Sequence, residues 1–211
     1  MRIKLGRREL LEKCMALGVV TSTANLLPST IAEGWAQSES RSRTPTPMAE
    51  LGPFYKRLAP ATHTLRQSGD PGMDLAVTGA VFSTRGEAIP SATVEVWQTN
   101  HIGLYDTEGY HYRAKLSSDA KGGYDFTSVI PGHYPARVCQ HVHYLVTAPG
   151  FKPLTTQLYF ATDPVFEGDP DKNYTRDPLI TSRELVRPVT LLGDPKDIRA
   201  GVRFELVLEP A

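Results

Sequence analysis

The chain has 211 residues, of which 40% are hydrophobic and 22% are charged, so it can bury the core of one ordinary domain. Its 23 basic and 23 acidic residues give a formal net charge of zero. Without a basic stripe or a block of like charges, the sequence argues against nucleic acid or an anionic membrane surface as a partner. Seventeen glycines and seventeen prolines favour a turn-rich β protein over a helical bundle.

The first 36 residues follow the order of a secretory signal. A positively charged start that includes Arg7-Arg8 precedes an apolar stretch over residues 14–27 and small residues that end near Ala36. The arginine pair resembles a twin-arginine signal, so we expect residues 1–36 to export the protein, to the periplasm. An ordinary amphipathic N-terminal helix is the alternative. The apolar stretch is too short and too polar for a permanent transmembrane helix.

Residues 37–50 are predicted to form a flexible arm, because they are mostly Ser, Thr, Pro and Arg at their start. Beyond the arm, residues 51–211 are predicted to form one catalytic domain. Several of its segments have the alternation or the β-branched composition of strands. These segments are residues 75–82, 92–98, 124–127, 140–148, 155–161 and 199–208.

No segment beyond the signal keeps helical periodicity for more than about two turns. The sequence therefore predicts an all-β fold, an antiparallel Greek-key β-sandwich with long loops. Residues 162–178 contain three Asp-Pro pairs and no periodicity, so we expect them to form a long ordered loop or a flap. Cleavage after Ala36 would leave Cys139 as the single cysteine, which excludes an internal disulfide.

A pair of histidines lies inside a predicted strand. Side chains at positions i and i+2 of a strand point to the same face, with their Cα atoms about 6.6 Å apart. His141 and His143 can therefore converge on one metal ion, while Val142 packs into the sandwich. The same pattern also occurs on half-exposed strands that bind nothing, so a metal site needs further support.

Two tyrosines provide that support. Tyr134 is presented by a rigid Pro131-Gly132 turn, and Tyr105 by a loop that follows the strand ending at Gln98. A tyrosine of a β protein more often bonds its hydroxyl to the backbone. Two phenolates with two imidazoles nonetheless form a coherent ligand set, because phenolate is a hard anionic donor that suits Fe(III) better than Zn(II) or Cu(I). With one bound hydroxide, the three negative charges would balance the ferric ion.

Five ordered segments resemble motifs of the intradiol ring-cleavage dioxygenases, the family of protocatechuate 3,4-dioxygenase and catechol 1,2-dioxygenase. They occur in the family's order over roughly residues 50–165. The segments are Gly52-Pro53-Phe54-Tyr55, Val94–Asn100 with Gly103-Leu104-Tyr105, Pro131–Pro135, His141-Val142-His143 and Thr156–Phe160.

The resemblance implies a mononuclear non-haem Fe(III), held by Tyr105, Tyr134, His141 and His143, that is used with O2 to cleave a catecholic ring to a cis,cis-muconate-type diacid. It also implies that Tyr134 is the axial ligand, which dissociates when the substrate binds. Gln157 matches a glutamine that lines the family's pocket. The implied partners are a small aromatic diol and O2, and exposed sandwich edges would permit a homo-oligomer.

One position departs from the family's pattern. Members usually carry an arginine three residues before the first histidine ligand, where its charge stabilises negative charge on the ring. Here that position is Val138, and Arg137 lies one residue earlier. A one-residue shift in a strand reverses the side-chain direction. Either a local bulge returns Arg137 to the site, or its role is lost.

Two other kinds of protein remain open at this point. A transthyretin-like or carboxypeptidase-regulatory β-sandwich, serving as a binding module of the cell envelope, would have similar strands but no reason to keep the tyrosines and histidines. A hydrolase with zinc on His141 and His143 would need a third ligand, for which Cys139 is the nearest candidate. The substrate is also open among protocatechuate, catechol, hydroxyquinol and larger aromatics, with Val94–Asn100 closer to the protocatechuate type.

Overall fold

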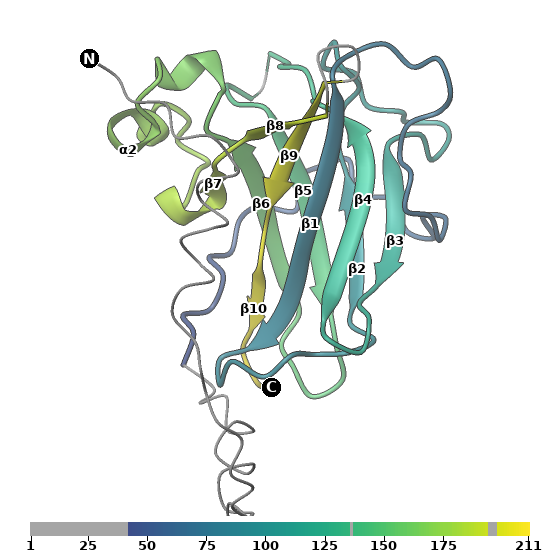
Figure 1. Ribbon diagram of the computed structural model, residues 1–211, viewed down its shortest axis with the longest axis vertical. Coiled ribbons are helices and arrows are strands. Elements are labelled where there is room, and N and C mark those ends of the chain that lie inside the picture. The colour runs from purple at the N-terminus through teal and green to yellow at the C-terminus, as the bar shows by residue number, and fades with distance from the viewer. Residues whose placement is uncertain (1–41, 136, 194–197) are drawn as a thin grey trace, which may run out of the picture. The chain divides into compact units, whose positions relative to one another are not determined.

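The computed structural model describes residues 42–135, 137–193 and 198–211. Within them, two five-stranded sheets pack against each other as a sandwich (Figure 1). The predicted β-sandwich is confirmed. The export signal predicted over residues 1–36, and residues 37–41 of the predicted arm, lie outside the described residues.

The first sheet is built around the long strand β1 (Asp74–Ser83). It pairs in antiparallel fashion with β4 and in parallel with β9 and β10, while β8 pairs with β9. The bounds of these partners are β4 (Gly123–Val129), β8 (Thr190–Leu192), β9 (Arg199–Arg203) and β10 (Leu206–Leu208). The single strand predicted over residues 199–208 is thus divided in two.

The second sheet carries the candidate site. Its strands are mostly antiparallel, except that β6 and β7 are parallel. The order across the sheet is β3 (Arg113–Ser117), β2 (Thr93–Trp97), β5 (His141–Thr147), β6 (Leu154–Phe160) and β7 (Val186–Arg187).

The predicted antiparallel pairing holds for most strand pairs, but both sheets are mixed. Apolar alternation reports which face of a strand is buried, and it carries no information on the direction of the neighbouring strand. Strands β3, β7 and β8 were not predicted. Strand β3 has charged residues at two of its five positions, and β7 and β8 have two and three residues, too few for a pattern to show.

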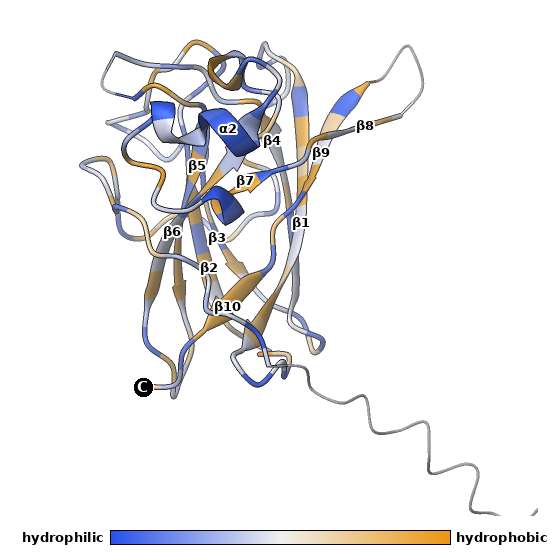
Figure 2. Cartoon of the chain, turned by 90° about the vertical axis from the view of Figure 1, so that its left-hand side faces the viewer, coloured by the Kyte–Doolittle hydropathy of each residue, from blue (hydrophilic) through white to orange (hydrophobic). Residues whose placement is uncertain are grey.

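Residues 162–178 are ordered, as predicted, but they fold into short helical turns. These are η1 (Pro164–Phe166), α2 (Pro170–Asn173) and η2 (Tyr174–Arg176), followed later by η3 (Arg183–Leu185). The first two turns begin at an Asp-Pro pair whose aspartate caps the free backbone N–H groups. None of the residues of α2 is buried, and Figure 2 shows this helix in the blue of hydrophilic residues.

The core lies between the sheets. Along β5, Val142, Tyr144 and Val146 are fully buried in it, whereas His141 and His143 point to the opposite face of the sheet. The predicted inward and outward faces of this strand are therefore correct. No helix among the described residues is long and apolar enough to span a bilayer.

The part of the predicted arm that the structure describes is attached to the sandwich. The backbone N–H groups of Arg43, Thr46 and Ala49 donate to carbonyl oxygens of Thr84, Val207 and Thr155. The flexible-arm prediction therefore does not hold for residues 42–50. These hydrogen bonds use backbone groups, which the composition of the segment does not reveal.

We predict that the amide hydrogens of Arg43, Thr46 and Ala49 exchange with solvent more slowly in the protein than in a free peptide of residues 42–50, because each is hydrogen-bonded to the sandwich. Hydrogen–deuterium exchange read by mass spectrometry or NMR measures this. Exchange at the rate of the free peptide would contradict the attachment of the arm.

Candidate metal centre

The candidate site lies on the outer face of the second sheet, at the end drawn uppermost in Figure 1. The strand register places four side chains in one row across four strands. Arg113 of β3 is opposite Trp97 of β2, Trp97 is opposite His143 of β5, and His143 is opposite Gln157 of β6. His141 lies one row away, opposite Tyr159. Neighbours in such a row lie close enough to contact one another.

The two histidines converge as their spacing predicted. Their Nε2 atoms are 3.1 Å apart, and the side chains are 3% and 1% exposed. His141 Nδ1 lies 2.8 Å from the carbonyl oxygen of Cys139, which can only accept, so Nδ1 carries the hydrogen and Nε2 carries a free lone pair. Burial lowers the pKa of His141 to about 4, so the ring is neutral at pH 7, the form that binds metals.

His143 is fixed by the side chains around it. Its ring stacks on the indole of Trp97, with centroids 4.9 Å apart and planes 5° apart. Gly52 has a φ of +72°, and a Cβ there would lie 3.1 Å from His143 Cε1, so glycine suits both this backbone conformation and the close approach. Trp97 and Gly52 lie in two of the sequence motifs, but the motifs alone do not reveal this role.

Two interlocked loops bring the tyrosines together. Gly103 has a φ of +86°, and a Cβ there would lie 1.9 Å from the carbonyl oxygen of His133. The N–H of Gly132 donates to the carbonyl oxygen of Asn100 at 2.8 Å, which ties the same two loops from the other side. As a result the rings of Tyr105 and Tyr134 meet edge to face, 5.6 Å apart.

Tyr105 is held deep in the site. Its ring stacks on Phe54, with centroids 4.2 Å apart, and lies 6.3 Å from the ring of His143. Its hydroxyl is buried and has no hydrogen-bond partner among the described residues. Burial raises the pKa of Tyr105 far above its ordinary value, with the neighbouring Tyr134 adding to the effect.

Tyr134 is half-buried, and its ring lies 5.8 Å from that of His141. Burial also raises the pKa of Tyr134, whereas its contact with Tyr105 and the charge of Arg137 oppose this rise. Both tyrosines are half-buried, but the buried hydroxyl without a hydrogen-bond partner among the described residues is that of Tyr105.

The arrangement fits a hard trivalent cation. Imidazole nitrogens bind first-row metal ions at about 2.0–2.1 Å, so two of them 3.1 Å apart can reach the same ion. The unpaired hydroxyl of Tyr105 is an oxygen donor without another use in the described structure. A bound cation would also reverse the cost of forming phenolates in a buried place.

No group of three His, Cys, Asp or Glu side chains in the described ranges is placed to share a metal ion. The zinc-hydrolase alternative therefore lacks its third ligand. Cys139 is instead buried in the hydrophobic core cluster.

A cavity of about 390 Å³ opens beside these side chains. Most of its wall is apolar, and Arg137 contributes the one cationic side chain of its described lining. The lining residues are Glu50, Gly52, Pro53, Phe54, Tyr134, Pro135, Arg137, His143 and Leu179. The volume suits a small aromatic molecule.

Arg137 faces this cavity, and Val138 is 45% exposed on the outside. The alternation of side chains along a strand does not set the direction of Arg137. This residue follows a tight turn in which its N–H donates to the carbonyl oxygen of Tyr134 at 2.9 Å. Its Nη2 donates to Gln157 Oε1 at 2.9 Å and to the Tyr159 hydroxyl at 2.6 Å. The displaced arginine and Gln157 are thus brought together.

Two buried aspartates that the sequence analysis did not single out support the segment carrying Tyr134 and Arg137. Asp163 accepts hydrogen bonds from the N–H of Gln140 at 2.7 Å and from His133 Nε2 at 3.1 Å. Asp177 accepts from the N–H of Cys139 at 3.2 Å and lies 3.7 Å from Arg137 Nη2. Both belong to Asp-Pro pairs, which was the available signal.

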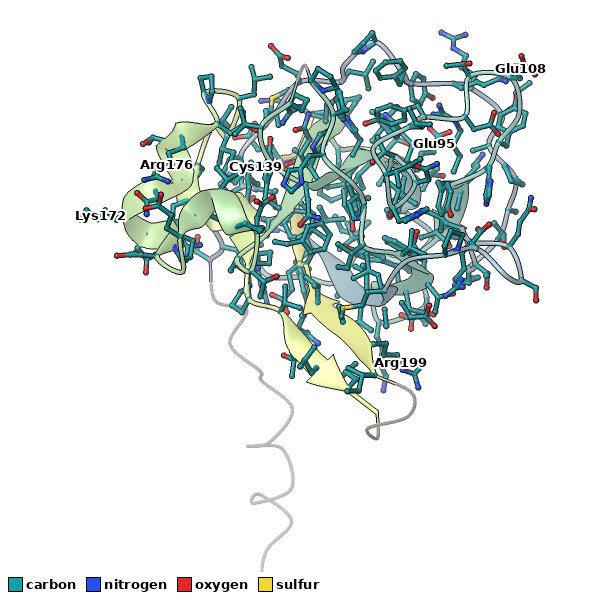
Figure 3. The ribbon with its side chains drawn as sticks, turned by 90° about the horizontal axis from the view of Figure 1, so that it is seen from above. Glu95, Glu108, Cys139, Lys172, Arg176 and Arg199 are labelled. Atoms are coloured by element: carbon teal, nitrogen blue, oxygen red, sulfur yellow. The ribbon has the colours of Figure 1, made fainter. Side chains whose placement is uncertain are left out.

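Figure 3 looks down on this end of the molecule. Cys139 lies toward the helical turns that carry Lys172 and Arg176, whereas Glu95 and Glu108 lie on the other side. The segment of residues 162–178 therefore flanks the site from one side, where its aspartates reach the chain ahead of β5.

Comparisons with known proteins agree with this geometry. A family model described as "Dioxygenase" matches residues 51–210. Catechol 1,2-dioxygenase 2 of Acinetobacter lwoffii is 35% identical over 153 residues, covering 59% of this chain and 54% of that protein. Hydroxyquinol 1,2-dioxygenase of Corynebacterium glutamicum is 31% identical over 188 residues, covering 76% and 62%. The chain spans less than two thirds of the length of either relative.

Among solved structures, the chain resembles the dioxygenase domain of a dioxygenase carbohydrate-binding protein fusion from Streptomyces sp. SirexAA-E. The TM-score is 0.68 at 30% identity, and the match covers 80% of this chain and 100% of that one.

We predict that Gly103→Ala destabilises the protein more than Gly150→Ala. Both glycines have positive φ, but a Cβ at Gly150 would meet nothing within 4 Å. Backbone strain alone should cost Gly150→Ala about 1 kcal/mol of unfolding free energy. The overlap with His133 should cost Gly103→Ala an additional ~1–3 kcal/mol. Equal values from urea unfolding would contradict the interlocked loops.

Proposed function

Since this chain belongs to the intradiol ring-cleavage dioxygenase family, we propose that it cleaves a catecholic ring with O2 at a mononuclear ferric centre. The observation that carries the proposal is the convergence of His141 and His143 with Tyr105 and Tyr134 beside a cavity. These four side chains are the proposed ligands. The product is a cis,cis-muconate-type diacid.

The donor set explains why the metal is iron rather than zinc. Two neutral imidazoles and two phenolates supply nitrogen and hard anionic oxygen, which suit Fe(III). When bound, the ferric ion would supply the charge that draws both catechol oxygens and makes the ring reactive towards O2. Tyr105, which is stacked on Phe54 and has no other partner for its hydroxyl among the described residues, would stay bound to the ion, whereas Tyr134 would be the ligand that can move away.

The residues of the chain then have separate tasks. Pro53, Phe54 and Leu179 line the cavity and exclude water from the bound ring. Tyr134 would hold the ion through its phenol oxygen and would accept a proton from a substrate hydroxyl at that same atom. Arg137 faces the cavity and stabilises negative charge that develops on the ring.

The substrate class follows from the relatives and the cavity. The relatives named above act on catechol and hydroxyquinol, according to their names. The mostly apolar cavity of about 390 Å³ suits a small ring, and the proposed iron would bind its two adjacent hydroxyls. We therefore propose a catechol or hydroxyquinol type of diol, and O2 uptake with a panel of catechols identifies the member.

We predict that the purified protein is red-brown from phenolate-to-iron charge transfer and contains one iron per chain. Tyr105→Phe should lose the colour and the iron together, because it removes an anionic ligand that has no other partner among the described residues. Visible absorption and metal analysis measure both quantities. Tyr110→Phe is the matched control, since Tyr110 donates its hydroxyl to the carbonyl oxygen of Arg57, away from the site.

A colourless wild type that binds no iron would instead favour the envelope binding module. Full colour and activity in Tyr105→Phe would remove Tyr105 from the ligand set. Zinc in place of iron in the protein as purified would refute the proposed reaction.

We also predict that the loss of Arg137 affects the reaction more than iron binding, because its guanidinium donates to Gln157 Oε1 and to the Tyr159 hydroxyl, and neither residue is a proposed ligand. Changing Arg137→Met together with Asp177→Asn avoids leaving a buried charge unpaired. The double variant should keep its iron and colour while kcat falls by about 10²–10³-fold.

Asp177→Asn alone is the control for the double variant, and it should lose less activity because Arg137 remains. Steady-state O2 uptake and metal analysis distinguish the two effects. If the double variant turned over substrate as fast as Asp177→Asn, Arg137 would have no part in catalysis.

A further inference from the structure

Arg113, the first residue of β3, is a buried cation that the proposed mechanism does not use. It is 3% exposed and lies in the same cross-strand row as Trp97 and His143. No carboxylate among the described residues lies within salt-bridge distance of its guanidinium. A buried charge without a partner is costly, so its retention calls for a specific contact.

The contacts of Arg113 join two loops. Its Nη1 donates to the carbonyl oxygen of Phe54 at 2.6 Å, and its Nη2 donates to the carbonyl oxygen of Asp106 at 3.0 Å. Its Nε is buried and has no partner among the described residues. The planar guanidinium suits this task because it presents several donors in a fixed geometry.

Both of these carbonyl groups belong to residues that hold Tyr105. The ring of Phe54 stacks on Tyr105 with centroids 4.2 Å apart, and Asp106 is the next residue in the chain. A single side chain thus fixes the aromatic cover of Tyr105 and the backbone that carries it. Movement of either loop would displace the phenol oxygen from the histidines.

The loop after Tyr105 is held in one conformation by its own hydrogen bonds, so that fixing its end also fixes Tyr105. The carboxylate of Asp106 accepts from the N–H groups of Gly109 at 2.7 Å and His111 at 2.8 Å, which lie four and two residues before the start of β3. The loop therefore closes on itself, with Arg113 fastening its two ends. Asp106 uses its carboxylate for the loop and offers Arg113 only its carbonyl oxygen.

We propose that Arg113 is a positioning residue of the iron site, which fixes Tyr105 as a ligand by clamping the loops of Phe54 and Asp106 together. The inference rests on the ferric site proposed above. A buried cation next to Tyr105 also complements the anionic oxygen that this site requires.

The test compares iron binding in Arg113→Met, Arg113→Lys and Lys115→Met. Lys115 is an exposed cation on the same strand, so its variant controls for the loss of one positive charge. The readouts are the iron dissociation constant, the position of the visible charge-transfer band and the melting temperature of the iron-free protein.

Arg113→Met should weaken iron binding by about 10–100-fold, as is usual when a residue that orients a metal ligand is removed. Its charge-transfer band should shift, because the Tyr105 oxygen no longer has one fixed position. Arg113→Lys should recover part of the affinity, since an ammonium can still reach one of the two carbonyl groups. Lys115→Met should match the wild type in its iron dissociation constant and in the position of its charge-transfer band.

Wild-type affinity and an unshifted band in Arg113→Met would overturn the inference, and a band as much altered in Lys115→Met would do the same. If Arg113→Met does not fold, Arg113→Lys decides on the same criteria, with an unchanged affinity and band counting against the inference. An iron-free wild type would refute the proposed function, whereas an iron-loaded wild type with indifferent Arg113 variants would refute this inference alone.

Discussion

Nε2 of His141 and Nε2 of His143 face each other at 3.1 Å in a place that solvent hardly reaches. Nε2 of His141 presents a lone pair, because its Nδ1 donates to a carbonyl oxygen, so either a hydrogen on His143 Nε2 or a bound cation must lie between the two nitrogens. The period of a β-strand produces this approach, and the stacking of Trp97 on His143 fixes it. The two tyrosines and the cavity lie beside this pair of nitrogens, and together they form one candidate site.

The loops around the histidines are organised to bring anionic oxygen to the same place. Gly103 and Gly132 allow two backbone segments to touch, which puts Tyr105 and Tyr134 side by side. Asp163 and Asp177 hold the segment ahead of β5. The sandwich provides the rigid strand that carries the two histidines, and the loops at its end carry the two tyrosines.

The sequence revealed the parts of the structure that follow a short period. Alternation in residues 140–148 predicted both the buried face of β5 and the convergence of the histidines, and the motif order predicted the family. The direction of Arg137 could not be predicted by strand parity, because the chain turns between Tyr134 and Arg137. Parallel pairing and strand β3 were missed, since neither leaves a pattern of apolar residues.

The other omissions share one physical cause. The attachment of residues 42–50, the two buried aspartates and the clamp of Arg113 all depend on hydrogen bonds to backbone groups. Every residue carries such groups, so the partner of a polar side chain cannot be recognised from residue types alone. These contacts become visible only when the loops are seen together in three dimensions.

The most direct test of the central claim is a crystal structure with anomalous diffraction measured on both sides of the iron absorption edge. The proposed iron site should give one anomalous peak per chain that appears only above the iron edge. The peak should lie about 2.1 Å from Nε2 of His141 and of His143. The hydroxyl oxygens of Tyr105 and Tyr134 should complete its protein ligands. A peak that appears only above the zinc edge, or an iron peak away from these four side chains, would contradict it.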